Sequence, residues 1–334
     1  MIRSMPLLVA LLLIAPAQGQ EPQSEGTRGA FHWEPRVDRL ADLYFEVRAH
    51  AAQEPTELEP AALAHAVSVV REQGAKISHP LLWGPLDAEI EGVSSARELL
   101  ERFEALPESR PMLGGGELRL REIGVAIGNA LLEWEPIHAV EVWPARRTSI
   151  AAKKSEVEAR WKEKSPAVWK FVLDAFGMED PGGSAPVYLV SVAPPPGGVT
   201  YYRRAGGGGM CIVGLEGAEG TQLDETVLHE ALHALEAQAG RDAESAPNAL
   251  RSKMMESGAS PRDPKVRNRP HLLLFVQAGE SVKRFIDPEH RHYGEVSGAY
   301  ERFGKDADLV RREWVRYLDG EQTREKAIAK IAEG

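Results

Sequence analysis

The sequence predicts an α+β fold that is predominantly helical and contains one small β-sheet. Apolar residues recur at helical spacing over most of the 334-residue chain. Three short runs rich in β-branched residues, 186–192, 199–203 and 210–215, follow one another in the middle of the chain. A helical stretch over 221–240, with polar residues bordering its apolar side, comes directly after them. This order puts a small sheet next to a helix that carries candidate functional side chains.

Residues 1–20 are typical of a secretory signal peptide. Arg3 precedes an apolar core over 7–15, and small residues at 15–19 precede a polar stretch. The apolar core is too short to span a bilayer. We therefore expect a secreted or periplasmic protein that keeps no stable membrane anchor once the signal is removed.

The composition excludes some partners and one means of stabilisation. The formal net charge is -10 and no run of five basic residues occurs, so we expect no nucleic-acid partner. Cys211 is the only cysteine, so the chain must fold without an intramolecular disulfide. A chain of this length can bury enough apolar surface to do so.

Residues 21–110 are predicted to form an N-terminal helical region. Apolar side chains recur at helical spacing over 37–47 and again over 63–70. Several prolines separate these stretches and prevent one continuous helix.

The remaining residues, 111–334, are predicted to form the second domain. Its first half contains a helix or long strand over 118–132, a short strand over 137–142 and a long helix over 148–176. The strand predicted over 210–215 has two interpretations. It is either the edge of a cleft, where it could pair with an extended peptide, or an ordinary internal strand.

The helix predicted over 222–239 carries His229, Glu230 and His233 in the arrangement HExxH. Residues four apart lie on the same side of a helix, so both imidazoles can reach one metal ion. Glu230 can then take a proton from a metal-bound water without binding the metal itself. The alternative is that the two histidines have a structural role, with ordinary hydrogen bonds and no metal.

The start of this helix has the sequence of a capping box. Thr221 is followed three residues later by Asp224, and acidic residues suit the positive end of the helix dipole. We therefore expect the Thr221 side chain to cap the helix.

The third metal ligand must come from elsewhere in the chain. The metzincin continuation, a glycine three residues and a histidine six residues after His233, is absent. Glu280, on a second helix predicted over 272–286, is the preferred third ligand, and Glu256 is the second choice. His271 lies nine positions before Glu280, on the opposite side of a regular helix, so the two should not bind one metal. His271 is then expected to be a residue at the helix start, a residue that contacts the metal ligands from behind, or a residue of the cleft.

The motif HEALH, followed by HLLLFVQAGE and a terminal WVRYLDG, resembles an uncharacterised bacterial family of secreted zincin-like proteins. The resemblance covers about residue 185 to the C-terminus. It implies a zincin-like core with a gluzincin-type site at His229, His233 and Glu280, with Glu230 as the general base. The thermolysin-type NExxxD signature is missing, so the resemblance is to the broad class only.

The expected function is that of an exported metallopeptidase that hydrolyses peptide bonds through a zinc-activated water. The cofactor is Zn²⁺ and the partner is a peptide or protein substrate. Beside Glu230, the candidate catalytic residues are Tyr293, whose phenol could stabilise the oxyanion, and His271. The alternative is a non-catalytic metal-binding or structural protein of the cell envelope.

Overall fold

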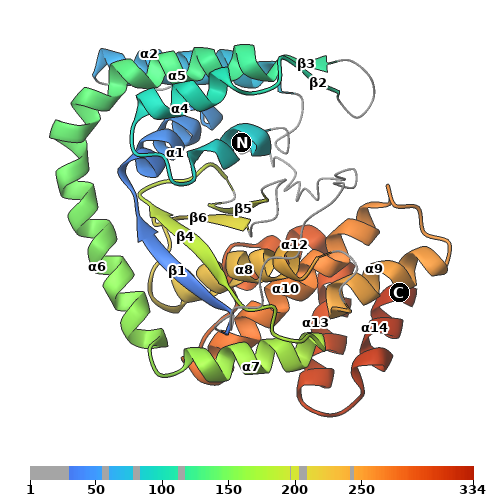
Figure 1. The fold of residues 1–334 in the computed structure, drawn as a ribbon. Helices are drawn as coiled ribbons and strands as arrows, with labels where there is room; N and C mark the ends of the chain where they lie inside the picture. Colours follow the sequence, from blue (N-terminus) through green and yellow to red (C-terminus); the bar gives the residue numbers. More distant parts are fainter. Residues whose placement is uncertain are drawn as a thin grey trace.

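A computed structural model describes residues 30–54, 60–77, 83–111, 117–195, 197–202, 209–240 and 244–334. The predicted signal peptide at 1–20 lies outside the described residues. The described part is predominantly helical with a small mixed sheet, which confirms the predicted α+β class (Figure 1). None of its helices is both long and apolar enough to cross a membrane.

The central sheet has four strands in the order β1-β4-β6-β5. β1 (His32–Val37), β4 (Ser184–Val190) and β6 (Gly209–Gly214) are parallel, and β5 (Gly198–Tyr202) runs antiparallel to β6. β6 is thus an internal strand, and β5 is the edge strand on that side. The helical region predicted over 21–110 was wrong at β1, which is a strand. Pro35 is tolerated there because β1 is also an edge strand.

The sheet separates two hydrophobic cores. In β4, Val187 and Leu189 face one core while Tyr188 and Val190 face the other. In β6, Cys211 and Val213 lie on the first side, with Met210 and Ile212 on the second. Both faces are buried, as expected for strands flanked by helices.

Helices of the N-terminal half cover one face of the sheet (Figure 1). They are α1 (Arg39–Ala52), α2 (Ala61–Ala75), α3 (Gly84–Asp87), the short 3₁₀ helix Ala88–Ile90, α4 (Ala96–Glu104) and α5 (Leu120–Ile137). A two-stranded hairpin, β2 (Arg110–Pro111) and β3 (Glu117–Leu118), joins α4 to α5.

A long helical connection then runs to the other face of the sheet. It consists of a π-helical segment (His138–Val142), α6 (Trp143–Trp161) and α7 (Ser165–Phe176). The strand predicted over 137–142 was wrong, because the helix continues and Val140 is 75% exposed. The single helix predicted over 148–176 is two helices, and Pro166 lies in the first turn of the second.

The C-terminal helices cover the other face of the sheet, where α8 packs against β5 and β6 (Figure 1). They are α8 (Gly220–Ala239), α9 (Ala246–Glu256), α10 (Pro264–Phe285), α11 (Tyr293–Val296), α12 (Ala299–Phe303), α13 (Lys305–Leu318) and α14 (Arg324–Glu333). The second predicted helix thus begins eight residues earlier than expected. α8 and α10 pack against each other and carry the candidate site.

Candidate metal centre

α8 brings the HExxH residues to the interior of the molecule. His229 and Glu230 are 4% and 5% exposed, and His233 is half-buried. The predicted capping box does not form. The N-cap is Glu219 without a side-chain hydrogen bond, and the Thr221 hydroxyl instead lies 2.8 Å from His290 Nδ1. The buried Asp224 accepts hydrogen bonds from two residues of α6.

α10 delivers a third imidazole to the same point. Its N-cap is Asp263, whose side chain accepts from the backbone N–H of Lys265, and Pro264 is its first residue. His271 therefore lies inside the helix and not at its start, and it is 5% exposed.

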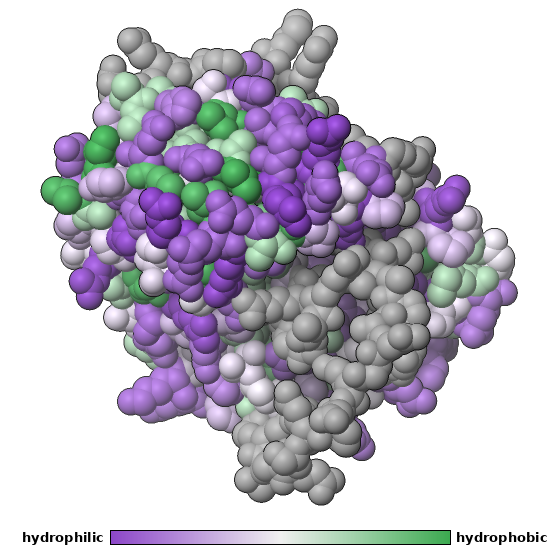
Figure 2. Space-filling view, turned by 45° about the horizontal axis from the view of Figure 1, so that its top comes forward, coloured by the Kyte–Doolittle hydropathy of each residue, from purple (hydrophilic) through white to green (hydrophobic). Residues whose placement is uncertain are grey.

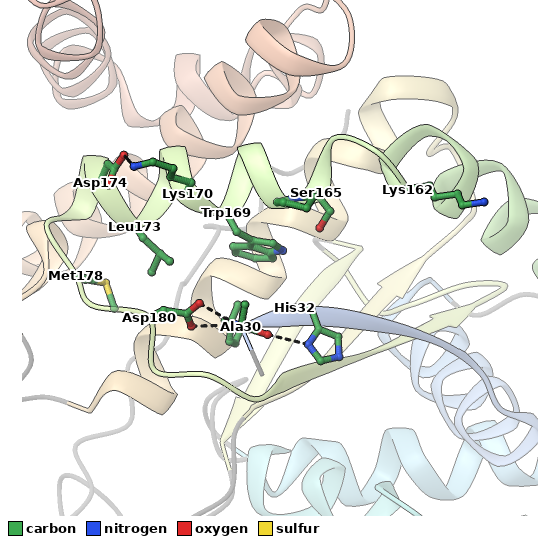
Figure 3. A pocket seen from close by; sticks show the side chains of 12 residues that line it. Ala30, His32, Lys162, Ser165, Trp169, Lys170, Leu173, Asp174, Met178 and Asp180 are labelled. Atoms are coloured by element: carbon green, nitrogen blue, oxygen red, sulfur yellow. Dashed lines mark hydrogen bonds and ion pairs between the residues drawn. The ribbon is translucent and has the colours of Figure 1, made fainter. Parts of the chain in front are cut away.

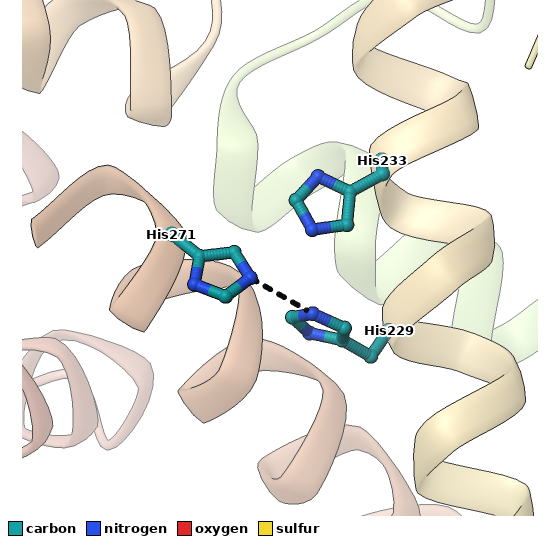
Figure 4. Close-up of side chains that lie close together, drawn as sticks. All are labelled: His229, His233 and His271. Carbon is teal, nitrogen blue, oxygen red and sulfur yellow. Dashed lines mark hydrogen bonds between the residues drawn. The ribbon is translucent and has the colours of Figure 1, made fainter. Parts of the chain in front are cut away.

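The three imidazoles converge, as Figure 4 shows. His229, His233 and His271 form a triad whose ligand nitrogen atoms lie within 4.8 Å of one another. His229 Nε2 and His271 Nε2 are 3.2 Å apart. Two nitrogen ligands of a tetrahedral zinc site stand about 3.4 Å apart when each bond is about 2.1 Å. The pair thus has the spacing of two vertices of such a site.

The surroundings hold these imidazoles neutral. Burial, together with the neighbouring imidazoles, lowers the pKa values of His229 and His271 well below the ordinary histidine value. Burial and the charge of Arg251 lower the pKa of His233 to about 4. The Phe275 ring stacks on His229 with 4.0 Å between ring centroids. Neutral imidazoles are the form that binds a metal.

Glu280 does not join the triad, so the prediction that it is the third ligand is corrected. Its Oε1 lies 3.2 Å from His292 Nε2, and its Oε2 accepts from Arg284 Nε at 3.0 Å. The physical reason is helix geometry. Nine residues along α10 put Glu280 half a turn around the axis and about 13 Å along it from His271. The helix spacing allows either His271 or Glu280 to face His229 and His233, but not both. In the structure it is His271 that faces them.

Glu256, the second choice, is also remote from the triad. It lies at the end of α9, its side chain is 70% exposed, and its nearest cation is Lys253 at 3.9 Å. A solvated carboxylate of this kind is an ordinary surface group.

Tyr293 lies close enough to Glu230 for their charges to interact. Burial raises the pKa of the Tyr293 phenol, Arg302 opposes this, and the carboxylates of Glu225 and Glu230 raise it further. The Tyr293 backbone N–H donates to Glu225 Oε2 at 2.5 Å. Its segment is thereby attached to α8, one turn before His229.

Two buried histidine–carboxylate pairs hold residues 290–293 against α8 and α10. His290 Nε2 lies 2.7 Å from Glu225 Oε2, and His292 pairs with Glu280. His292 also lies against Gly279, where an added Cβ would come within 2.6 Å of its ring. These contacts attach residues 290–293 to α8 and α10.

Glu230 itself packs against the edge strand. Its Oε2 accepts from the Thr200 hydroxyl at 2.7 Å. Burial raises the pKa of Glu230 to about 8, although this hydrogen bond opposes the effect. Sequence reasoning missed Thr200, because no local pattern links a threonine in one strand to a glutamate 30 residues later.

A pocket in another part of the molecule is a different feature. It has a volume of about 600 Å³ and lies between the start of β1 and α7, lined by residues such as His32 and Trp169 (Figure 3). Three of its charged side chains have partners: Lys170 pairs with Asp174 at 2.6 Å, and Asp180 accepts from the backbone N–H of Phe31. Hydrophilic side chains predominate on the molecular face in Figure 2, with apolar ones in small areas among them. The histidine triad, and not this pocket, is therefore the candidate functional site.

Comparisons with protein-family models, with curated proteins and with solved structures find no match to this chain. The family resemblance of the two sequence blocks stays a prediction. The chemistry of the site rests on the residues of this chain alone.

Proposed function

We propose that this protein is an exported zinc-dependent peptidase with a zincin-like core. His229, His233 and His271 hold Zn²⁺, and Glu230 is the general base. The observation that carries the proposal is the convergence of three buried or half-buried imidazoles, one of which is followed directly in the sequence by the buried Glu230. Ligands and base are thus separate residues.

The donor set fits zinc. Three neutral nitrogen ligands suit this ion and leave a fourth position for a water molecule or substrate. His229 and His271 turn their Nε2 atoms toward each other at 3.2 Å, as two ligands of one ion would. When bound, Zn²⁺ would supply a Lewis acid that polarises a carbonyl group and lowers the pKa of a water molecule.

Glu230 moves the proton. Its carboxylate accepts a proton from the attacking water and later gives it to the leaving nitrogen of the peptide. Its burial supports this role, because a carboxylate removed from bulk water is a stronger proton acceptor than an exposed one. Tyr293 donates a hydrogen bond to the oxygen on which negative charge develops.

The edge strand supports a peptide as substrate. β5 has β6 as its one strand partner among the described residues, so its other edge can pair with an extended backbone. Glu230 contacts the same strand through Thr200. A peptide aligned on β5 would therefore pass the general base.

The test combines metal analysis with a cleavage assay. Purified protein should contain about one zinc per chain and cleave members of a mixed peptide library. Glu230→Gln should retain zinc and lose at least about 100-fold in kcat, the usual contribution of a general base. Exposed Glu216→Gln is the matched control and should behave like the wild type.

The outcomes separate the alternatives. Zinc without cleavage of any peptide would favour the non-catalytic metal-binding protein. Cleavage that Glu230→Gln retains would remove the assigned role of Glu230. Protein that binds no zinc at all would refute both the metal centre and the peptidase.

A further inference from the structure

The two oxygens of the Glu230 carboxylate have different surroundings on β5. Oε2 accepts from the Thr200 hydroxyl at 2.7 Å. Oε1 has no hydrogen bond among the described residues and lies over Gly198, where an added Cβ would come within 2.7 Å of it. Thr200 and Gly198 are two positions apart in the strand, so they share the face that β5 turns toward α8.

The backbone of Glu230 is held by the same strand pair. Its carbonyl oxygen accepts from the Thr200 hydroxyl at 3.0 Å and from the Cys211 thiol at 3.3 Å. Thr200 and Cys211 are directly opposite each other across β5 and β6. A threonine hydroxyl has one proton to donate. Because the thiol can serve the carbonyl, that proton is available to Oε2.

The geometry points to β5 as the element that positions the general base: the Thr200 hydroxyl fixes Oε2, and the absent side chain of Gly198 leaves Oε1 as the oxygen that accepts the proton. This inference rests on the proposed role of Glu230. In the reaction, one proton moves from water to Oε1 and then to the leaving nitrogen. The new C–O bond forms from the water oxygen, and the C–N bond breaks. Thr200 is a positioning residue, because its hydroxyl acts through the Glu230 carboxylate.

The first test is kinetic and uses the zinc-loaded protein with one quenched-fluorescent peptide from the cleaved library. Thr200→Val keeps the shape of the side chain and removes the hydroxyl. It should lower kcat roughly tenfold, as expected for the loss of one hydrogen bond to a charged group, with KM and zinc content unchanged. Thr200→Ser should restore most of kcat. Exposed Thr148→Val, which removes a hydroxyl that bonds to Pro144, is the control.

Gly198→Ala tests whether the absent side chain of Gly198 leaves Oε1 of Glu230 free to accept the proton. Its methyl group should displace Oε1 and lower kcat while zinc content is retained. In a Glu230→Gln background, Thr200→Val and Gly198→Ala should cause no further loss, because both act through Glu230. A further loss of the same size in that background would contradict the positioning role.

The second test does not depend on activity. A double-mutant cycle of Thr200→Val and Glu230→Ala is measured by urea unfolding of the metal-free protein. The two changes should couple, with at least about a fivefold non-additive effect on the unfolding equilibrium constant. Additive changes, or wild-type kcat in Thr200→Val, would overturn the inference. If the wild-type protein cleaves no peptide, the proposed function fails, and the cycle still decides whether Thr200 fixes Glu230.

Discussion

His229 Nε2 and His271 Nε2 face each other at 3.2 Å across the contact between α8 and α10. This relationship makes His271 the partner of the HExxH histidines. Glu280, on the opposite side of α10, contacts His292 and Arg284 instead. The proposed zinc site therefore has three imidazoles and no carboxylate among its ligands.

Substitution of His271 and of Glu280, one at a time, should show which of the two is the third zinc ligand. His271→Ala should weaken zinc binding by at least about 100-fold, because one of three protein ligands is lost. Glu280→Gln should leave zinc affinity unchanged and lower the melting temperature, because it removes a charge from a buried ion pair. Competition with a chromogenic chelator measures affinity, and calorimetry measures stability. The opposite pattern would restore Glu280 as the ligand.

The HExxH part of the site could be predicted from sequence because it is local. Spacing within one helix determines that His229 and His233 share a side. The third ligand depends instead on where α10 begins and how it packs on α8. The Asp263–Pro264 pair was a sufficient signal for a helix start, and it would have put His271 inside the helix.

Other features could not be predicted because they are contacts between distant segments. β1 forms by pairing with β4, about 150 residues later, and its own sequence contains Pro35. The contact of Thr200 with Glu230 joins a strand to a helix. The strands β4, β5 and β6 were predicted within two residues, because their apolar, β-branched runs are dense enough to be recognised locally.

Zinc should stabilise the fold. An ion that is present at 1,000 times its Kd for the native state contributes about 4 kcal/mol, which corresponds to roughly 6 °C in melting temperature for a chain of this size. Removal of metal with a chelator should lower the melting temperature by that order, and added zinc should restore it. His233→Ala should show no response to zinc. A chelator-independent melting temperature in the wild-type protein would contradict a tight metal site.

Tyr293 is expected to contribute to turnover and not to metal binding. Tyr293→Phe should lower kcat by roughly 10-fold to 100-fold with zinc content unchanged, because one hydrogen bond to the developing oxyanion is lost. Tyr317→Phe is the matched control, since its hydroxyl donates to the Ala175 carbonyl, far from the site along the chain. Equal kcat values for Tyr293→Phe and the control would remove Tyr293 from the mechanism.

Glu313 should make the C-terminal helices sensitive to acid. Burial raises its pKa, but hydrogen bonds from Arg312, Lys330 and Gln322 outweigh this and lower the pKa to about 2. A depressed carboxyl pKa contributes stability above the unfolded value of 4.5, and this contribution is lost as the pH falls from 4.5 toward 2. Urea unfolding at pH 7 and pH 3 should show a smaller loss of stability in Glu313→Gln than in the wild type. Glu321→Gln, an exposed partner of Arg316, is the control.

The central claim is that α8 and α10 together hold one zinc ion through three imidazoles. X-ray absorption at the zinc edge of the purified protein, combined with anomalous diffraction from its crystals, tests this most directly. We expect one zinc per chain with three histidine nitrogens at about 2.0–2.1 Å, from His229, His233 and His271. A zinc ligated by Glu280 or located elsewhere, or no metal in zinc-supplemented protein, would contradict the account.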